Sequence, residues 1–490
     1  MNESSFNLML LLPEMLLLIG ICVLLLSDAG GVQRRFGGTA RALLVLALAL
    51  LALVPQSSTT TETAFGGMVI VDSLSRLLKL CAVVAVGATL VLSARYCDDR
   101  AVARGEFQSL ALLSLLGQFV MISANHLLVV YLGLELMSLA LYSLAALRRD
   151  SGQSSEAAIK YFVLGALASG FLLYGMSMIY GGAGTLAIDE IAGRLVGGEV
   201  DPWVFALGLV FIVAGLAFKF GAVPFHMWIP DVYHGTPTAM TLLIAGAPKL
   251  AAFAVAFRLL AEGMMAAWAD WQPMLLVLSV ASLVVGNVVA IAQQNLKRML
   301  AYSTISQVGF VLLGMLSGVV DGDAAGAADA WGSSLFYIVT YVFTTVGTFG
   351  VIMLMSRAGF EAETLDDLRG LNQRSPWVAL VMLLLMFSLA GIPPLVGFYA
   401  KFIIIGSLVS AGLTWLAILA VMLSLVAAFY YLRVVKLMYF DAPADHAPLS
   451  YSRSAAAVLS VNGALVFLLG ILPGPLMGAC LEAVRQALGS

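Results

Sequence analysis

Long apolar stretches, separated by short polar connections, follow one another along almost the whole chain. A membrane-spanning helix needs about 20 mostly apolar residues, and we find fourteen such stretches, numbered here in chain order. They cover residues 6–27, 39–56, 70–96, 107–124, 126–147, 155–180, 203–230, 237–260, 271–293, 299–319, 331–356, 376–410, 413–440 and 454–473. The pattern predicts an all-α polytopic membrane protein with about fourteen transmembrane helices and no large domain outside the membrane.

Lysine and arginine are distributed unevenly among the connections. Those that leave odd-numbered stretches contain sixteen such residues, whereas those that leave even-numbered stretches, up to the last helix, contain only Arg194. The sixteen are Arg34, Arg35, Arg41, Arg95, Arg100, Arg104, Arg148, Arg149, Lys297, Arg298, Arg357, Arg369, Arg374, Arg433, Lys436 and Arg453. Because positive charge marks the cytoplasmic side, both termini are expected to be periplasmic. One helix more or fewer would scramble the bias, so the charges also favour fourteen helices.

Two stretches are interrupted by the same Gly-x-x-Pro motif, at residues 221–224 in the seventh and 391–394 in the twelfth. Proline removes a backbone donor and clashes with the preceding turn, so both helices should break there. The breaks are five helices apart and therefore run in opposite directions, which predicts an inverted repeat of helices 4–8 and 9–13. Two unrelated kinks are the alternative.

The repeat divides the chain into four predicted parts. These are N-terminal helices 1–3 (residues 1–106), the first five-helix repeat (107–262), the second repeat (271–440) and a C-terminal helix with its tail (454–490).

Composition agrees with a lipid environment. Hydrophobic residues make up 61% of the chain and charged residues 11%, and the mean hydropathy is +1.00; a soluble domain is about a quarter charged. The net charge of -3 and the lack of a basic tract argue against nucleic acid as a partner. The four cysteines are far apart and no glycine-rich phosphate loop occurs, so neither a metal nor a nucleotide site is predicted.

Four ionisable residues lie deep inside apolar stretches. Glu135 lies near the middle of the fifth, Lys219 beside the seventh break, Lys249 in the middle of the eighth, and Lys401 after the twelfth break. A charge at this depth costs roughly 2.5–3.5 kcal/mol on insertion scales. We therefore expect all four side chains to face the interior of the bundle, next to partners or water.

Lysine is informative because burial brings its proton exchange within reach of neutral pH. A lysine–glutamate pair whose separation changes can take up and release a proton, and Glu135 with Lys219 is the expected pair. A static salt bridge that only joins helices is the alternative. Arg76 and Lys79, near Asp72, are expected to form a cluster at the outer interface.

His226 and Lys160 are two further candidates. His226 follows Lys219 by two helical turns, nominally on the same face, and its titration range suits a proton relay to Lys249. A polar cap on the broken helix end is the alternative. Lys160 begins the sixth helix, four residues after Glu156. It is either a cytoplasmic entrance for protons or a snorkelling side chain with a local ion pair.

Three segments resemble the antiporter-like subunits that respiratory NADH:quinone oxidoreductase (complex I) shares with Mrp cation/proton antiporters. They are residues 219–237 (KFGAVPFHMWIPDVYHGTP), 295–309 (NLKRMLAYSTISQVG) and 391–402 (GIPPLVGFYAKF). Within this family the chain is most similar to N-type subunits, through residues 160–175 (KYFVLGALASGFLLYG) and 247–258 (APKLAAFAVAFR). With the fourteen-helix plan, the resemblance covers most of the chain.

The resemblance implies a role for each buried residue. Glu135 resembles the glutamate that modulates the channel lysine, and Lys219 resembles that lysine. Lys249 resembles the central lysine of the eighth helix, with His226 as the histidine between them. Lys401 resembles the lysine near the periplasmic exit, where an M-type subunit is expected to carry glutamate.

The implied function is a proton-translocating membrane subunit that couples quinone reduction to proton pumping. No cofactor is expected in this chain; NADH, FMN, iron–sulfur clusters and quinone would bind elsewhere in the complex. The expected partners are K-type and M-type membrane subunits and lipid, in a bacterial inner membrane. Two alternatives stay open: an Mrp-type subunit that exchanges Na⁺ for H⁺, and a structural protein whose charges only hold helices together.

Overall fold

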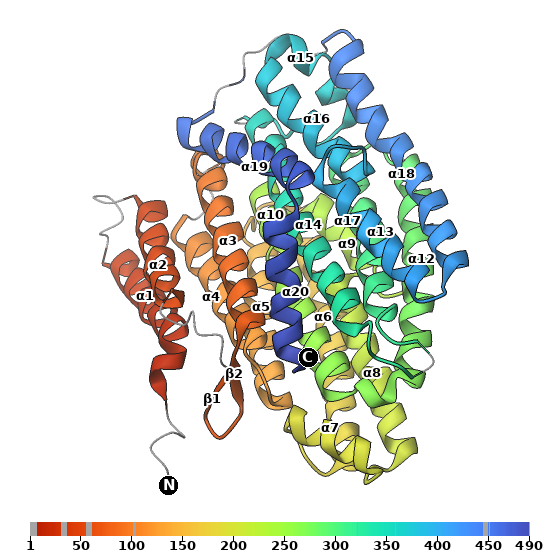
Figure 1. The fold of residues 1–490 in the computed structure, drawn as a ribbon. Helices are drawn as coiled ribbons and strands as arrows, with labels where there is room; N and C mark the ends of the chain where they lie inside the picture. Colours follow the sequence, from red (N-terminus) through yellow and green to blue (C-terminus); the bar gives the residue numbers. More distant parts are fainter. Residues whose placement is uncertain are drawn as a thin grey trace.

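The computed structural model describes residues 7–30, 37–54, 61–100, 104–320, 322–357, 359–443, 449 and 451–489. Part of the connection predicted over 28–38, with Arg34 and Arg35, lies outside these residues. Almost all of the described chain is helical (Figure 1).

Fourteen membrane crossings account for most of the helices. In chain order they are α1 (Leu12–Ala29, preceded by η2, Leu8–Leu11), α2 (Gly38–Leu53), α3 (Ser73–Asp99), α4 (Arg104–Ile122), α5 (Leu127–Ala145), α6 (Gly152–Ala183), α8 (Pro202–Phe220) with α9 (Trp228–Gly235), α10 (Thr238–Ala245) with α11 (Pro248–Ala256) and η4 (Phe257–Gly263), α12 (Trp268–Ala292, preceded by η5, Met265–Ala267), α13 (Leu296–Leu316), α14 (Ala327–Met355), α16 (Pro376–Ala390) with α17 (Val396–Ser410), α18 (Thr414–Phe440) and α19 (Arg453–Ile471).

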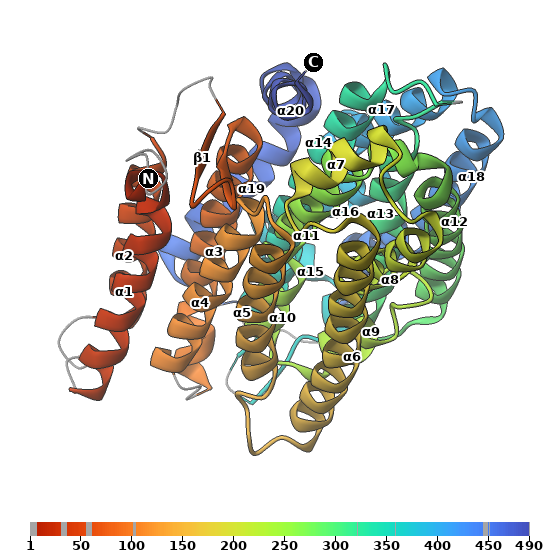
Figure 2. The same ribbon diagram turned by 90° about the horizontal axis from the view of Figure 1, so that it is seen from below.

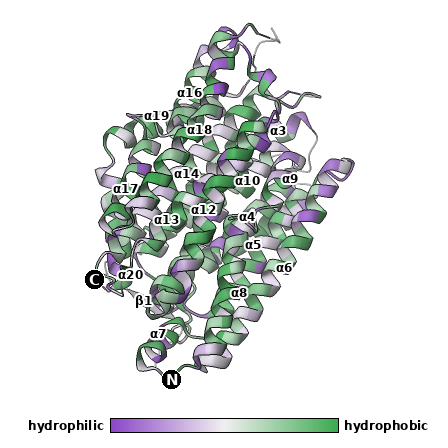
Figure 3. Cartoon of the chain, turned by 90° about the vertical axis from the view of Figure 1, so that its right-hand side faces the viewer, coloured by the Kyte–Doolittle hydropathy of each residue, from purple (hydrophilic) through white to green (hydrophobic). Residues whose placement is uncertain are grey.

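The predicted fold class is confirmed. Within the described residues, twelve helices are long and apolar enough to cross a membrane unaided. The shorter α2 and the broken pair α16–α17 supply the remaining two crossings. Hydrophobic residues cover the helices along most of their length, and hydrophilic ones gather near helix ends and connections (Figure 3).

The crossings are arranged around a buried centre. α10, α11, α13 and α14 are almost wholly enclosed by other helices. α1 and α2 form one outer flank, and α12 and α18 lie at the opposite end of the bundle (Figures 1 and 2). A charged side chain on the central helices is therefore removed from lipid as well as from bulk water.

Ion pairs between connections support the number of crossings. Arg100 Nε lies 2.6 Å from Glu361 Oε1, which joins the end of α3 to the connection after α14. On the other side, Arg485 on α20 lies 3.0 Å from Asp329 at the start of α14. Both contacts join ends that the fourteen-helix count places on the same side. Figure 2 likewise shows both termini, β1 and α7 along one edge.

The two predicted helix breaks have the same local geometry. α8 ends at Gly221 with φ +79°, and α16 ends at Gly391 with φ +86°. Glycine adopts this left-handed conformation without the penalty that a Cβ brings. The glycine N–H bonds the carbonyl four residues back in both cases, at 2.8 Å from Ala217 and 3.0 Å from Phe387. Each break also contains one cis X–Pro bond. This similarity is expected for an inverted repeat.

The eighth crossing contains a further break, which was not predicted. α10 ends at Gly246, and Pro248 opens α11 at its first turn. Proline suits this position because the first helical N–H groups have no intrahelical partner. α11 then continues into the π-helix η4, an irregularity that is often found at functional sites.

Several short elements outside the crossings were also not predicted. They are the hairpin β1 (Glu62–Ala64) and β2 (Val69–Val71), α7 (Ile188–Gly197), η6 (Leu365–Leu368), α15 (Leu371–Arg374) and α20 (Gly474–Leu488). α7 packs against η4, and α20 packs along α3 and α14. α7 therefore lies at the end of the crossing that closes with η4, and α20 lies beside the start of α14.

Candidate functional site

Lys249 and Lys401 point at the broken ends of two helices. Lys249 Nζ, on α11, donates a hydrogen bond to the carbonyl of Phe220 at 3.1 Å. Lys401 Nζ, on α17, donates to the carbonyls of Leu389 and Ala390, each at 3.0 Å. These carbonyls are the last ones of α8 and α16, which lack partners inside their helices and carry negative partial charge. Each lysine therefore caps the C-terminal end of a half-helix inside the membrane.

None of the three predicted lysines has a carboxylate partner within the described chain. Lys219, Lys249 and Lys401 form no ion pair at 4 Å or less, and their hydrogen bonds go to neutral oxygen atoms. Lys249 is 2% exposed and Lys401 is 6% exposed. A desolvated ammonium without a counterion is expensive. The burial of each ammonium group is therefore offset only by hydrogen bonds to neutral oxygen atoms.

Glu135 and Lys219, the expected pair, form no ion-pair contact in this structure, and their action as a proton-exchanging pair stays a prediction. Lys219 Nζ, at the end of α8, donates to Ser138 Oγ on α5 at 2.9 Å. Glu135 lies one turn earlier on the same face of α5 and forms no ion pair with Lys219 within 4 Å. Its Oε1 is buried without a hydrogen-bond partner. Ser138 therefore forms the contact between α5 and Lys219, and Glu135 lies one turn away from that contact.

His226 lies in the break, between α8 and α9. Its side chain is half-buried, and its Nδ1 is enclosed without a hydrogen-bond partner. The expectation that it continues the helical face of Lys219 is wrong, because Gly221 ends α8 and the intervening residues form turns. A buried ring nitrogen is normally satisfied by protein or by ordered water. The side chain is thus available to a water molecule in the break.

Lys160 lines a polar cavity at the predicted cytoplasmic end of α6. Its Nζ lies 2.8 Å from Glu156, which confirms the local ion pair, and 2.8 Å from Asp231 on α9. Arg298 also bonds Asp231, at 2.8 Å. With His234, these residues surround about 220 Å³. The cavity is therefore lined by charged side chains of both signs.

A chain of hydroxyl and amide groups surrounds Lys401. Tyr337 on α14 donates to Gln307 on α13, which donates to Tyr431 on α18 at 3.0 Å. Tyr431 and Ser303 share a 2.5 Å hydrogen bond. Beside Lys401, Gln307 and Tyr337 line a cavity of about 20 Å³, which is enough for a water molecule. Sequence reasoning missed this network because single polar residues in apolar helices do not reveal their partners.

Two buried ion-pair clusters were also missed. Arg258 lies 2.7 Å from Asp72 and 2.5 Å from Glu262, and neither Arg258 nor Asp72 is exposed. Lys79 lies 2.5 Å from Glu14 on α1 and is 1% exposed. The expected cluster of Arg76 and Lys79 near Asp72 is therefore wrong, because Lys79 pairs with Glu14 and Asp72 pairs with Arg258. Glu14 and Arg258 are charged residues that each interrupt an apolar stretch of the sequence. This interruption could have predicted a buried ion pair at both places.

Comparisons with known proteins agree with this architecture. The family model described as NADH:quinone oxidoreductase/Mrp antiporter, TM, matches residues 124–427. NADH-quinone oxidoreductase subunit N of Herminiimonas arsenicoxydans is 54% identical over 99% of this chain and 100% of its own length. The subunit N of Nitrosomonas europaea is 52% identical, over 97% of this chain and 98% of its own length.

Solved structures show the same fold. A chain of respiratory complex I from Thermus thermophilus with bound aureothin is 34% identical, with a TM-score of 0.81, over 96% of this chain and 100% of that one. A chain of the Mrp complex from Dietzia sp. aligns over 98% of this chain and 97% of that one with a TM-score of 0.83, but at 20% identity it supports the fold alone. The chain is therefore a multi-pass membrane protein that belongs to the family of N subunits of NADH-quinone oxidoreductase, built on the fold shared with Mrp antiporter subunits.

Proposed function

We propose that this subunit translocates protons, coupled to quinone reduction in the assembled oxidoreductase. The observation that carries the proposal is that three lysines inside the crossings, the buried Lys249 and Lys401 and the half-buried Lys219, bond only neutral oxygen atoms of the described chain. A lysine held by a carboxylate is fixed in its charged form. A lysine held by a carbonyl or hydroxyl can lose its proton without leaving an unpaired buried carboxylate behind.

The contacts suggest an order for the proton route. The cavity around Lys160 opens at one end of α6 and gives a polar entrance. Lys219 and Lys249 meet at one break, because Lys249 bonds the carbonyl of Phe220, the residue after Lys219. His226 lies in that break with an unpaired ring nitrogen and is assigned the relay between them.

The route continues across α14 to the second break. α14 packs against both α11 and α17, which carry Lys249 and Lys401. Its hydroxyl side chains Thr340, Tyr341 and Thr344 line the cavity beside Lys401. We assign Lys401 to the exit, and Glu135 to the role of a carboxylate that modulates Lys219 from one turn away.

The remaining parts of the proposal concern the surroundings of the subunit. We place the chain in a bacterial inner membrane, with both termini periplasmic, on the basis of the lysine and arginine distribution. K-type and M-type membrane subunits are the proposed neighbours. NADH, FMN, the iron–sulfur clusters and quinone are assigned to other parts of the complex.

Two competing functions are distinguished by particular observations. Exchange of Na⁺ for H⁺ by an Mrp-type subunit is disfavoured because the 54% identity over nearly the whole chain is to a quinone oxidoreductase subunit. A purely structural role for the charges would be favoured by carboxylate partners, as Lys79 has in Glu14. Among the described residues, the three lysines of the proposed route have no such partner within 4 Å.

The test is Lys219→Ala in the assembled complex. In sealed vesicles, NADH-driven quinone reduction, proton uptake and the amount of assembled enzyme are recorded together, with Lys219→Arg as the matched control that retains a charge. We expect assembly to survive while turnover and proton uptake fall sharply in the alanine variant. Loss of assembly, or normal turnover and uptake, would assign Lys219 a structural role.

A further inference from the structure

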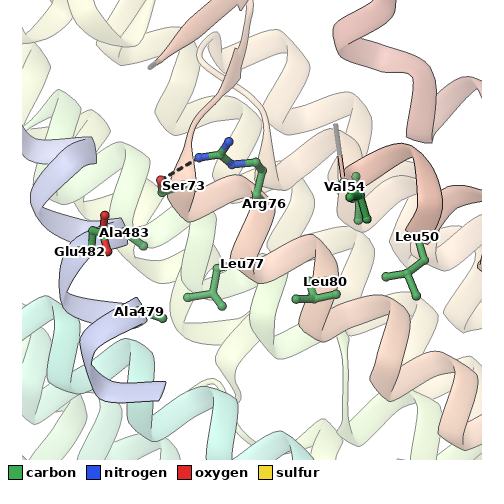
Figure 4. A pocket seen from close by; sticks show the side chains of 10 residues that line it. Leu50, Val54, Ser73, Arg76, Leu77, Leu80, Ala479, Glu482 and Ala483 are labelled. Carbon is green, nitrogen blue, oxygen red and sulfur yellow. Dashed lines mark hydrogen bonds between the residues drawn. The ribbon is translucent and has the colours of Figure 1, made fainter. Parts of the chain in front are cut away.

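A groove runs along the lipid side of α3, between α2 on one flank and α19 and α20 on the other. It is formed by two adjoining cavities of about 460 and 490 Å³, which share Leu50 on α2. The first cavity lies between α2, α3 and α20 (Figure 4). The second continues along α3 and reaches α14 and α19. We call the two together the α3 groove.

The α3 groove is longer than one lipid leaflet is thick. Its lining on α3 begins at Ser73 and ends at Val91, which is about 27 Å along a helix that rises 1.5 Å per residue. One leaflet of the hydrocarbon core is about 15 Å thick. Leu80 and Val84 stand 43% and 45% exposed along its floor. An acyl chain lying in the groove would cover these side chains.

Small residues keep the second cavity of the α3 groove open. Gly87 and Ala88 line it at the depth where α2 and α3 approach each other. A Cβ on Gly87 would meet only Leu46, at an ordinary contact distance of 3.6 Å. The glycine is therefore not required for helix packing at this point, and a larger side chain there would project into the groove.

The mouth of the groove carries one positive and one negative side chain. Arg76 on α3 donates a hydrogen bond to Ser73 Oγ at 2.9 Å, and Glu482 on α20 lies on the other wall (Figure 4). Neither forms an ion pair with the other, or with any other charged group in the described part of the chain, within 4 Å. α20 is held over this end because Gln486 accepts a hydrogen bond from the backbone of Ser73.

We propose that the α3 groove is a binding site for one zwitterionic phospholipid of the phosphatidylethanolamine class. Arg76 bonds the phosphate, since a guanidinium binds phosphate oxygens through charge-assisted hydrogen bonds. Glu482 accepts hydrogen bonds from the ammonium group, and an acyl chain fills the apolar length. A singly anionic headgroup would satisfy Arg76 and leave Glu482 next to negative charge. The pair of opposite charges thus selects a headgroup that carries both.

The site is tested by photocrosslinking in the assembled complex in native membranes. The probe is phosphatidylethanolamine with a diazirine on one acyl chain, and labelled peptides are mapped by mass spectrometry; a phosphatidylglycerol probe with the same chain is run in parallel. Three variants remove one feature each: Arg76→Leu, Glu482→Gln and Gly87→Leu. Arg453→Leu, an exposed arginine at the start of α19, is the matched control.

We expect label from the phosphatidylethanolamine probe on α3 peptides that contain residues 80–91. Arg76→Leu should lower it about tenfold, as loss of a charge-assisted bond predicts. Gly87→Leu should abolish it, Glu482→Gln should remove the preference over phosphatidylglycerol, and Arg453→Leu should change nothing. Three results would overturn the proposal. The phosphatidylethanolamine probe could label another subunit and leave α3 unlabelled, both probes could label α3 equally in the unaltered complex, or the labelling of α3 could survive Gly87→Leu.

Discussion

Replacing Arg258 with methionine should destabilise the subunit strongly. The guanidinium bonds Asp72 at 2.7 Å and Glu262 at 2.5 Å, in a place where Asp72 is fully buried and Glu262 is 16% exposed. Methionine has a similar length but provides no charge, so two carboxylates would face each other without a counterion. Asp72 would keep only its helix-capping bonds with Ser75.

The size of the effect follows from burial. Removing one partner of a buried ion pair destabilises a protein by about 3–5 kcal/mol, because it leaves an uncompensated charge. Replacing all three charges, with Asp72→Asn, Arg258→Met and Glu262→Gln together, should recover most of that loss, since no buried charge then lacks a partner. The matched control is Arg485→Gln, whose pair with Asp329 is more than half exposed on both sides and contributes no more than about 1 kcal/mol.

The assay is the amount of assembled complex on native gels, together with the thermal unfolding midpoint of the complex in nanodiscs. We expect Arg258→Met to lower both, the triple variant to recover them in large part, and Arg485→Gln to resemble the unaltered protein. If Arg258→Met assembles and unfolds normally, or if the triple variant is no better than the single one, the buried cluster is not what holds η4 against α3.

Three further substitutions test individual contacts. Ser138→Ala removes the hydroxyl that accepts from Lys219; quinone-reductase turnover in membranes should fall several-fold with assembly retained, and unchanged turnover would show that the contact is dispensable. Gly391→Ala puts a Cβ at φ +86°, so strain of about 1–3 kcal/mol should lower the unfolding midpoint. Gly406→Ala, where a Cβ meets nothing within 4 Å, should not. Asp231→Asn loosens the entrance cavity and should slow proton uptake by assembled enzyme; unaltered uptake would argue against this entrance.

The crossings could be predicted from the sequence because membrane burial leaves a direct signal. A span of apolar residues and a bias of positive charge are both readable along one chain, and the two Gly-x-x-Pro motifs place the breaks at Gly221 and Gly391. The break at Gly246 was missed although Pro248 follows it. α7 and α20 were missed because short amphipathic helices lack the long apolar run on which the count depended.

The contacts of the site could be predicted only in part. The four charges inside the crossings were identified because a charge in an apolar stretch is unusual. The partners of these charges were not identified. That Lys219 bonds Ser138 and not Glu135 depends on how α5 and α8 pack against each other. Lys249 and Lys401 bond backbone carbonyls. Every residue has a backbone carbonyl, so the sequence does not indicate which one a lysine will bond. The division of the chain into two repeats by residue number stays a prediction.

The central claim is that an intramembrane lysine bonded only to neutral oxygen atoms exchanges protons, whereas one held by a carboxylate is structural. It is tested most directly by comparing Lys401→Met with Lys79→Met, whose partner is Glu14, for proton uptake per NADH oxidised and for assembly in sealed vesicles. We predict that Lys401→Met assembles and loses uptake, while Lys79→Met assembles poorly and the enzyme that does assemble pumps normally. Equal losses of assembly in both variants, or normal uptake in assembled Lys401→Met, would contradict the account.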